Sequence, residues 1–94
     1  MIKTFACKDT EKIWEGIRSS RFPDEIQERA IKKLRQLEAA LDVDDLRYPP
    51  GNHLEYLRGN RRGQMSIRIN QQWRICFVFV KGSVYEVAIV DYHK

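Results

Sequence analysis

The sequence predicts an α+β domain in which two N-terminal helices pack on one face of a small, mainly antiparallel, twisted β-sheet. Apolar residues recur at helical spacing in the first half of the chain and alternate with polar residues in the second half. A segment rich in Asp, Pro and Gly, residues 42–52, separates the two patterns. Because 94 residues suit one domain, we expect a single unit over residues 1–94.

The chain is predicted to open with a short β-like segment, residues 2–5, followed by a first helix. Asp9-Thr10 offers an N-cap for this helix, and Ile13, Trp14 and Ile17 recur at helical spacing. We expect the helix to end at Ser19-Ser20.

A second helix is predicted over about residues 23–42. Pro23 fits its first turn, because the fixed φ of proline suits that position. The apolar residues then repeat at steps of four, four, three and four, which gives one apolar stripe: Ile26, Ala30, Leu34, Leu37 and Leu41. We expect this stripe to face the core.

Three strands are predicted after the break, over residues 64–69, 73–80 and 84–90. Their tight spacing is typical of an antiparallel meander. Alternation places Arg68 on the face opposite Ile67, and Arg74 on the face opposite the aromatic residues of its strand. If the helices cover the apolar face, both arginines belong to the open one.

Composition excludes several classes of protein. The longest apolar run, residues 75–80, is far shorter than the roughly 20 residues of a membrane helix, and the first residues lack the apolar stretch of a signal peptide. Cys7 and Cys76 stand far apart, and neither they nor the two histidines have the spacing of metal ligands. We therefore expect a cytoplasmic protein without membrane, metal or cofactor, and Cys76 buried and inert.

The charge is unevenly distributed. Residues 1–45 carry nine basic and ten acidic side chains, whereas residues 46–94 carry eight basic and three acidic ones. From residue 47 to residue 74 every basic side chain is an arginine, and the planar guanidinium suits bidentate phosphate contacts. This basic half is typical of a nucleic-acid-binding surface, although a merely solvated basic face has the same composition. The arginines are Arg47, Arg58, Arg61, Arg62, Arg68 and Arg74.

The chain ends with an acid, a phenol and an imidazole side by side: Asp91, Tyr92 and His93. Such groups can take and give protons, and nearby arginines can stabilise charge on a phosphate. Together they can cleave RNA without a metal, because a base can remove the proton of the 2′-hydroxyl, whose oxygen then attacks the adjacent phosphorus. Without further context, an ordinary polar tail is the better explanation of these three residues.

Four motifs supply that context, since together they resemble the HigB branch of the RelE/ParE toxin superfamily over nearly the whole chain. They are LEYLRGN at residues 54–60, SIRIN at residues 66–70, WRICF at residues 73–77 and DYH at residues 91–93. The resemblance implies the RelE-like microbial RNase fold. It also implies a ribosome-dependent endoribonuclease, the toxin of a bacterial type II toxin–antitoxin system, which cuts mRNA in the ribosomal A site by metal-free 2′-hydroxyl attack and so inhibits translation.

The resemblance also implies partners and roles for individual residues. The partners are a helix-turn-helix (HigA-like) antitoxin, operator DNA bound through that antitoxin, and the 70S ribosome with its A-site mRNA. The positions that match catalytic residues are Arg58, Arg74, Asp91, Tyr92 and His93. Residues expected to contact RNA or the ribosome are Arg61, Arg62, Arg68, Glu55 and His53, with Arg68 matching a basic sheet residue.

This chain departs from the family at one catalytic position. Some members carry histidine and proline where it has Glu55 and Tyr56, and that histidine is counted among the active groups. Glu55 can act as a base, although a carboxylate near RNA phosphate is electrostatically unfavourable, and His53 is an alternative only if the strand register shifts. Two rival functions remain open: a ParE-like inhibitor of DNA gyrase, and a catalytically inactive RNA-binding or regulatory module.

Overall fold

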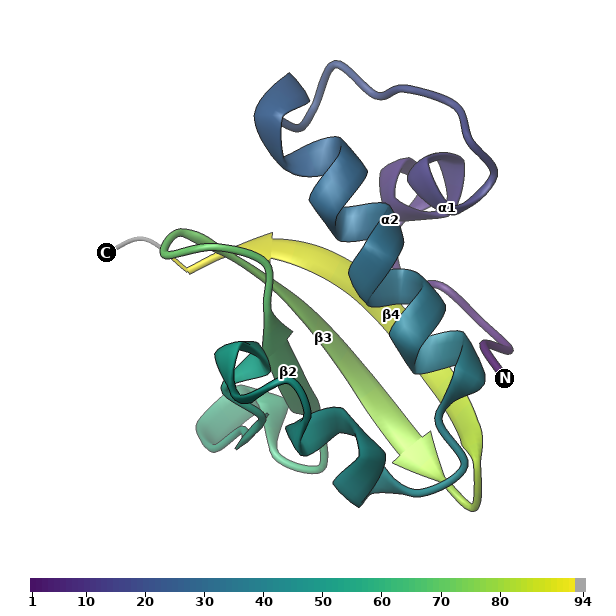
Figure 1. Ribbon diagram of the computed structural model, residues 1–94, viewed down its shortest axis with the longest axis vertical. Helices are drawn as coiled ribbons and strands as arrows, with labels where there is room; N and C mark the ends of the chain where they lie inside the picture. Colours follow the sequence, from purple (N-terminus) through teal and green to yellow (C-terminus); the bar gives the residue numbers. More distant parts are fainter. Residues whose placement is uncertain (93–94) are drawn as a thin grey trace.

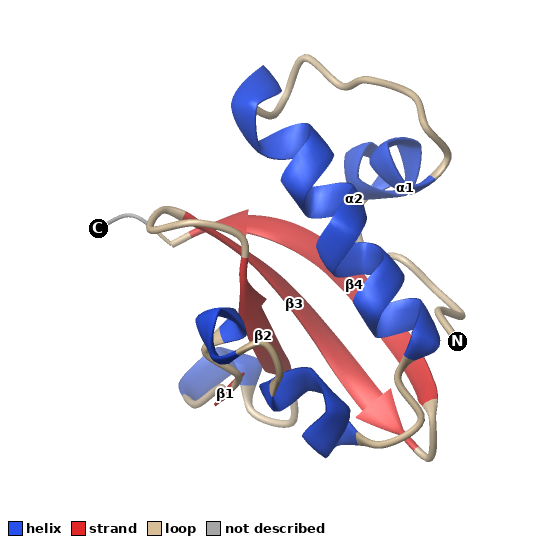
Figure 2. Cartoon of the chain, viewed as in Figure 1, coloured by secondary structure: helices blue, strands red, loops and turns tan. Residues whose placement is uncertain are grey.

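The computed structural model describes residues 1–92, in which two helices lie over one side of an antiparallel sheet (Figures 1 and 2). No helix among these residues is long and apolar enough to span a membrane. The helices and strands are α1 (Lys8–Trp14), α2 (Asp24–Ala39), β1 (Glu55–Tyr56), β2 (Met65–Arg68), β3 (Trp73–Val80) and β4 (Ser83–Asp91). Three short 3-10 helices complete the described elements: η1 (Val43–Arg47), η2 (Pro50–Asn52) and η3 (Gly59–Arg61).

The sheet has the strand order β1-β2-β3-β4, and each neighbouring pair is antiparallel. The predicted three-stranded meander is thus confirmed, with β3 found over the predicted residues 73–80. The strand β1 was not predicted, since it is only two residues long and exists through its pairing with β2. The N-terminal segment adds single parallel bridges, Ile2 to Val84 and Phe5 to Val87, along β4.

The second helix is shorter than predicted. It begins at Asp24, with Pro23 as its N-cap residue, and ends at Ala39 rather than near residue 42. Ala40 adopts an extended conformation, so Leu41 leaves the helix and is 84% exposed instead of belonging to the core. The rest of the stripe, from Ile26 to Leu37, is buried as predicted.

The first helix also differs from the prediction at both ends. Its N-cap residue is Cys7, because Asp9 and Thr10 already lie within the helix and their side chains serve other partners. The Asp9 carboxylate accepts a hydrogen bond from Ser19 Oγ (2.8 Å), and the buried Thr10 hydroxyl accepts one from the Ile89 amide (2.9 Å). The helix ends at Trp14, before Ser19 is reached, and Gly16 follows with a φ of 84°.

The core lies between the helices and one face of the sheet. Ile67 on β2, Ile75 on β3 and Ile89 on β4 are in cross-strand register and buried, so they form an apolar row across this face. Leu34 and Leu37 of α2 are fully buried members of the same cluster. Burial of this apolar surface is the main stabilising contribution to the fold, and it fixes which side chains remain for the other face.

Candidate functional site

The face of the sheet away from the helices carries a row of mainly polar side chains, which we call the polar row: Glu55, Ser66, Arg68, Arg74 and Cys76. Glu55 pairs with Ser66 and Ser66 with Cys76, while Arg68 pairs with Arg74. Residues directly opposite each other in an antiparallel sheet share a face. These side chains therefore converge, as the alternation of the sequence predicts for Arg68 and Arg74.

Arg74 is buried, with 7% of its surface exposed, and its guanidinium is held at several atoms. Its Nε donates to Ser66 Oγ (2.8 Å), and its Nη2 donates to the carbonyl oxygens of Ser66 (3.3 Å) and His53. Ser66 itself has no exposed surface, so the face of the sheet that was expected to be open is covered at Ser66 and Arg74. Burial is tolerated because the polar atoms find partners.

The segment that carries the His53 carbonyl is fixed by Asn52, which is fully buried. Its Nδ2 donates to Gln36 Oε1 (2.9 Å) and to the carbonyl of Leu46 (3.1 Å), and its Oδ1 accepts from Lys33 Nζ. His53 follows with a left-handed backbone (φ 44°). Among residues other than glycine, histidine is one of those that adopt this conformation more often than average. Helix α2 thus positions the segment beside the arginine.

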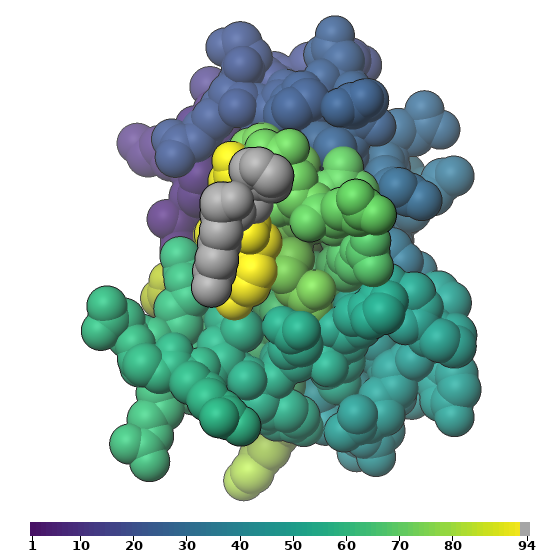
Figure 3. Space-filling view, turned by 90° about the vertical axis from the view of Figure 1, so that its left-hand side faces the viewer, coloured from purple at the N-terminus to yellow at the C-terminus, as the bar shows by residue number. Residues whose placement is uncertain are grey.

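A hollow of about 380 Å³ opens beside Arg74. Figure 3 shows the side of the molecule on which the described chain end (yellow), residues around 70 (green) and the segment of residues 50–62 (teal) lie close together. The hollow is lined by His53, Glu55, Arg68, Asn70, Gln71, Arg74 and Tyr92. Its rim therefore combines two guanidinium groups with a carboxylate, an imidazole and a phenol.

Two contacts join the ionisable groups in this hollow. The Arg74 Cζ lies 5.6 Å from the centroid of the Tyr92 ring, which is cation–π geometry. The Glu55 Oε1 lies 3.8 Å from Arg74 Nη2, with the Glu55 side chain 54% exposed. Arg74 thus presents a fixed positive charge between a phenol and a carboxylate, which suits an anionic ligand flanked by groups that can transfer protons.

Asp91, predicted beside Tyr92, is placed differently. It pairs with Trp73, whose strand position belongs to the face covered by the helices, and its Oδ2 accepts a hydrogen bond from Gln72 Nε2 (3.1 Å). Successive residues of a strand point to opposite faces. Hence Asp91 is not among the described residues that line the hollow, although it lies next to one of them in sequence.

The other predicted residues are divided between different places. Arg58 and Arg62 line a separate hollow of about 400 Å³ together with Leu57 and Gly59. The Arg61 side chain is exposed and donates to Gln64 Oε1 (3.3 Å). His93 lies outside the described residues.

Sequence reasoning missed three residues of the site: Ser66 as the partner of Arg74, and Asn70 and Gln71 on the rim. Ser66 and Asn70 belong to the motif SIRIN, and Gln71 lies between two predicted strands, but the sequence assigned none of them a role in the site. The available signal was that the turn between those strands directly follows Arg68, so its polar side chains had to lie near that arginine.

Cys76 is buried on the same face, and burial raises the pKa of its thiol, against smaller opposite effects from Arg61 and Arg74. A protonated thiol is a poor nucleophile, so the interpretation of Cys76 as inert is supported. Within residues 1–92, no three His, Cys, Asp or Glu side chains are grouped so as to hold a metal ion.

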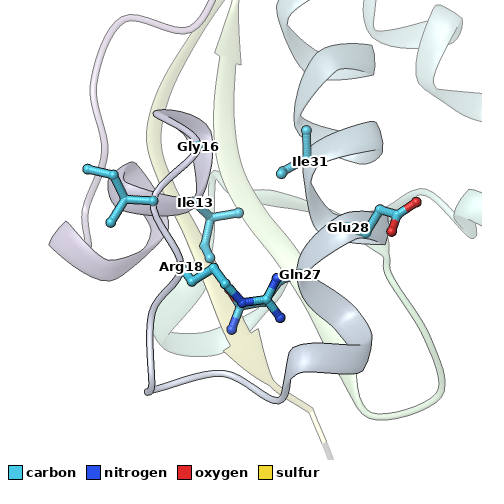
Figure 4. Close-up of a pocket in the computed structure, with 7 residues that line it drawn as sticks. Ile13, Gly16, Arg18, Gln27, Glu28 and Ile31 are labelled. Atoms are coloured by element: carbon cyan, nitrogen blue, oxygen red, sulfur yellow. The ribbon is translucent and has the colours of Figure 1, made fainter.

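Another hollow, of about 210 Å³, lies between α1 and α2 (Figure 4). Its described lining consists of apolar or amide groups, such as Ile13, Gln27 and Ile31, apart from Arg18 and Glu28. Arg18 already forms an ion pair with Asp24 (2.8 Å). The groups that can move protons beside a fixed positive charge are found at the Arg74 hollow, which we take as the candidate site.

Comparison with known proteins gives consistent results. A family model described as "RelE-like toxin of type II toxin-antitoxin system HigB" matches residues 3–93. The chain is similar to Toxin HigB-1 of Vibrio cholerae serotype O1 (39% identity, 100% of this chain and 99% of the relative) and to Endoribonuclease HigB of Proteus vulgaris (31% identity, 99% and 100%). Its fold is similar to a chain of the YoeB-YefM toxin-antitoxin complex from Staphylococcus aureus (TM-score 0.62, 22% identity, 100% and 97%).

Proposed function

The chain belongs to the HigB family of RelE-like toxins of type II toxin–antitoxin systems, and from this premise we propose that it is an endoribonuclease that cuts messenger RNA in the ribosomal A site. Cleavage there stops translation. The relative named Endoribonuclease HigB, which is 31% identical over its full length, supports RNA cleavage as the activity.

The observation that carries the proposal is the buried fork of Arg74. Three acceptors on two segments fix its guanidinium, while the hollow beside it leaves room for an anion. A fixed positive charge that does not reorganise is an effective stabiliser of charge that develops on a phosphate. Arg68, which lines the same hollow, adds a second guanidinium for a neighbouring phosphate oxygen.

The proposed reaction needs no metal. A base removes the proton of the 2′-hydroxyl, and the 2′-oxygen attacks the adjacent phosphorus. The bond from phosphorus to the 5′-oxygen breaks, and an acid protonates that leaving oxygen. The products are a 2′,3′-cyclic phosphate and a free 5′-hydroxyl, so atoms and protons balance.

The described side chains offer candidates for both proton transfers. Glu55 carries a carboxylate that can accept the 2′-hydroxyl proton, and His53 lines the same hollow despite its place outside the strand. Tyr92 brings a phenol next to Arg74, where it can donate to the leaving oxygen. Asp91 and His93 complete the proposed catalytic group by family resemblance. Arg58 retains a proposed catalytic role on the same ground, although it lines a different hollow.

The partners follow from the family. Its toxins belong to toxin–antitoxin pairs, and we propose a helix-turn-helix antitoxin that also binds operator DNA. The 70S ribosome is proposed as a requirement, because the described acid–base groups are few and the ribosome would position the RNA. Arg58, Arg61 and Arg62 form an exposed basic segment suited to contact with ribosomal RNA. Because translation takes place in the cytoplasm, we propose that the protein acts there.

The proposal is tested by primer extension on cellular mRNA after brief induction. Discrete cuts within codons, in frame and dependent on translation, are the expected result, and purified protein is expected to leave free mRNA nearly intact. Arg74→Ala serves as the inactive control. A DNA-damage response without mRNA cuts would contradict the proposal and indicate inhibition of gyrase instead. If induction causes neither mRNA cuts nor a DNA-damage response and growth is unaffected, the proposal is also contradicted, and the chain is an inactive module.

A further inference from the structure

A second basic hollow adjoins the candidate site. It measures about 440 Å³ and shares Arg68, Asn70 and Gln71 with the Arg74 hollow. Its other lining residues are Arg29, Lys33, Pro49, Gly51 and Ile69. Because three residues border both hollows, a bound chain can pass from one to the other across the turn between β2 and β3.

The charges of this second hollow come mainly from helix α2. Arg29 and Lys33 are four residues apart and therefore lie on one face of the helix, and Arg68, at the end of β2, lines the same hollow. The described lining contains no Asp or Glu to balance them. Lys33 is half-buried, and its pKa is lowered by burial and then by the neighbouring Arg29. An anion in the hollow would relieve this repulsion.

Lys33 is also held in place. Its Nζ donates one hydrogen bond to the side chain of the buried Asn52, and an ammonium group has three donors. Arg29 is exposed, so its guanidinium is accessible to a ligand. The hollow thus pairs one fixed ammonium with accessible guanidinium groups, and this donor set is typical of phosphate binding.

We propose that the hollow of Arg29, Lys33 and Arg68 binds a second RNA backbone phosphate next to the one at Arg74. The inference rests on the proposed function and deepens it, since it names how RNA is held beside the cleavage position. The shared ligand chemistry is an RNA phosphodiester, which belongs either to the cleaved strand or to ribosomal RNA.

Charge reversal on one helix provides a matched test. Arg29→Glu alters the hollow, whereas Lys32→Glu makes the same change in an exposed residue outside the described lining of the hollow. Each reversal places a glutamate four residues after an existing one, Glu25 or Glu28, so the repulsion within the helix is matched. Arg29→Lys keeps the charge and is expected to behave nearly as the wild type does.

Binding is measured with two probes, a fluorescent 2′-O-methyl hexanucleotide that cannot be cleaved and vacant 70S ribosomes. We expect Arg29→Glu to weaken binding to at least one probe about tenfold or more. If the lost contact is to the hexanucleotide, the slope of log affinity against log salt concentration becomes less steep by about 0.7 in Arg29→Glu, the value for one phosphate contact on a single strand. Lys32→Glu is expected to stay within about twofold of wild type. A loss on the hexanucleotide identifies the cleaved strand as the source, and a loss on ribosomes alone identifies ribosomal RNA.

Equal effects of Arg29→Glu and Lys32→Glu on both probes would overturn the proposal, as would failure of the wild-type protein to bind either. These outcomes are independent of the proposed activity. Cleavage of mRNA with equal binding effects rejects the second hollow alone, whereas selective loss of binding in a chain that never cuts RNA rejects the cleavage proposal alone.

Discussion

Both faces of the sheet bury side chains, but by different means. On the face beneath the helices, Ile67, Ile75 and Ile89 pack in an apolar cluster, where burial itself is favourable. On the other face, Ser66 and Arg74 are buried beneath the segment around residue 53, where burial is tolerated because hydrogen bonds satisfy each polar atom. Among the described residues, no buried side-chain nitrogen or oxygen lacks a partner.

This difference separates stability from chemistry. The apolar face can lose a methyl group and keep its shape, at a cost in folding free energy. The polar face depends on the geometry of a few hydrogen bonds that also orient the Arg74 guanidinium toward the hollow. Changes on the first face are therefore expected to alter the free energy of unfolding, and changes on the second to alter the rate of cleavage.

The largest expected effect on folding belongs to the apolar face. Ile75→Ala removes a fully buried side chain from the centre of the apolar row. A large-to-small change of this kind costs about 2–5 kcal/mol. Denaturant unfolding measures this loss, and the fraction that remains folded is expected to cleave at nearly the wild-type rate. A folded variant that cuts much more slowly would blur the distinction between the faces.

On the polar face, Arg74→Lys keeps the charge and loses the planar fork. A lysine cannot reproduce the contacts with the Ser66 hydroxyl and both carbonyls in one geometry. Single-turnover cleavage on programmed ribosomes is expected to fall by about 10²–10³, as for the loss of one charge-stabilising donor. Circular dichroism and thermal melting control for folding. Cleavage within a few fold of wild type would show that a simple charge suffices.

What could be predicted from the sequence also differs between the apolar core and the polar face. The apolar stripe of α2 and the strand β3 could be predicted, because periodicity records which face is buried in apolar surroundings. The end of α2 and the exposure of Leu41 could not, since they depend on where the chain turns at Ala40. The predicted N-cap at Asp9 was wrong, because the helix begins at Lys8 and the Asp9 carboxylate accepts a hydrogen bond from Ser19, ten residues along the chain.

The sequence predicted which types of residue form the site better than it predicted how they are arranged. Alternation placed Arg68 and Arg74 on one face, and the terminal motif identified Tyr92 as a site residue. In the structure all three line the same hollow. The sequence did not separate Asp91 from Tyr92, because the last strand was predicted to end at residue 90, whereas β4 continues to Asp91 and alternation then sends neighbouring side chains to opposite faces. Nor does periodicity predict that His53 lines the hollow, since its carbonyl reaches Arg74 through a left-handed turn outside any strand.

A smaller effect is expected at Arg58. Its side chain lines a hollow with Arg62 rather than with Arg74, so we expect its proposed catalytic contribution to be smaller than that of Arg74 and its substitution to affect RNA binding as well. Arg58→Ala is predicted to raise the toxin concentration needed for half-maximal cleavage on ribosomes and to change the maximal rate by less than about tenfold. A loss of maximal rate as large as that of the Arg74 variant would show instead that Arg58 contributes to the chemical step as much as Arg74 does.

The smallest effect concerns Cys76, the thiol within the polar row. Burial raises its pKa above the ordinary 9.0, so the folded protein holds the thiol proton more tightly than the unfolded chain does. The resulting stabilisation is present below pH 9 and is lost as the pH rises through the raised value. At pH 8, iodoacetamide is expected to modify Cys76 only after denaturation, as mass spectrometry can show. Rapid modification in the folded state would indicate that the row opens.

The central claim, that the face bearing Arg74 performs the chemistry, is tested most directly at Tyr92. Tyr92→Phe keeps the ring over the Arg74 guanidinium and removes only the hydroxyl. Tyr85→Phe makes the same change on β4, at a residue outside the described lining of the hollow. Single-turnover cleavage on programmed ribosomes is predicted to fall by about 10²–10⁴ for Tyr92→Phe, the range for loss of a proton-transfer group, and to stay unchanged for Tyr85→Phe. With both melting temperatures near wild type, equal and undiminished rates for the two variants would contradict the claim.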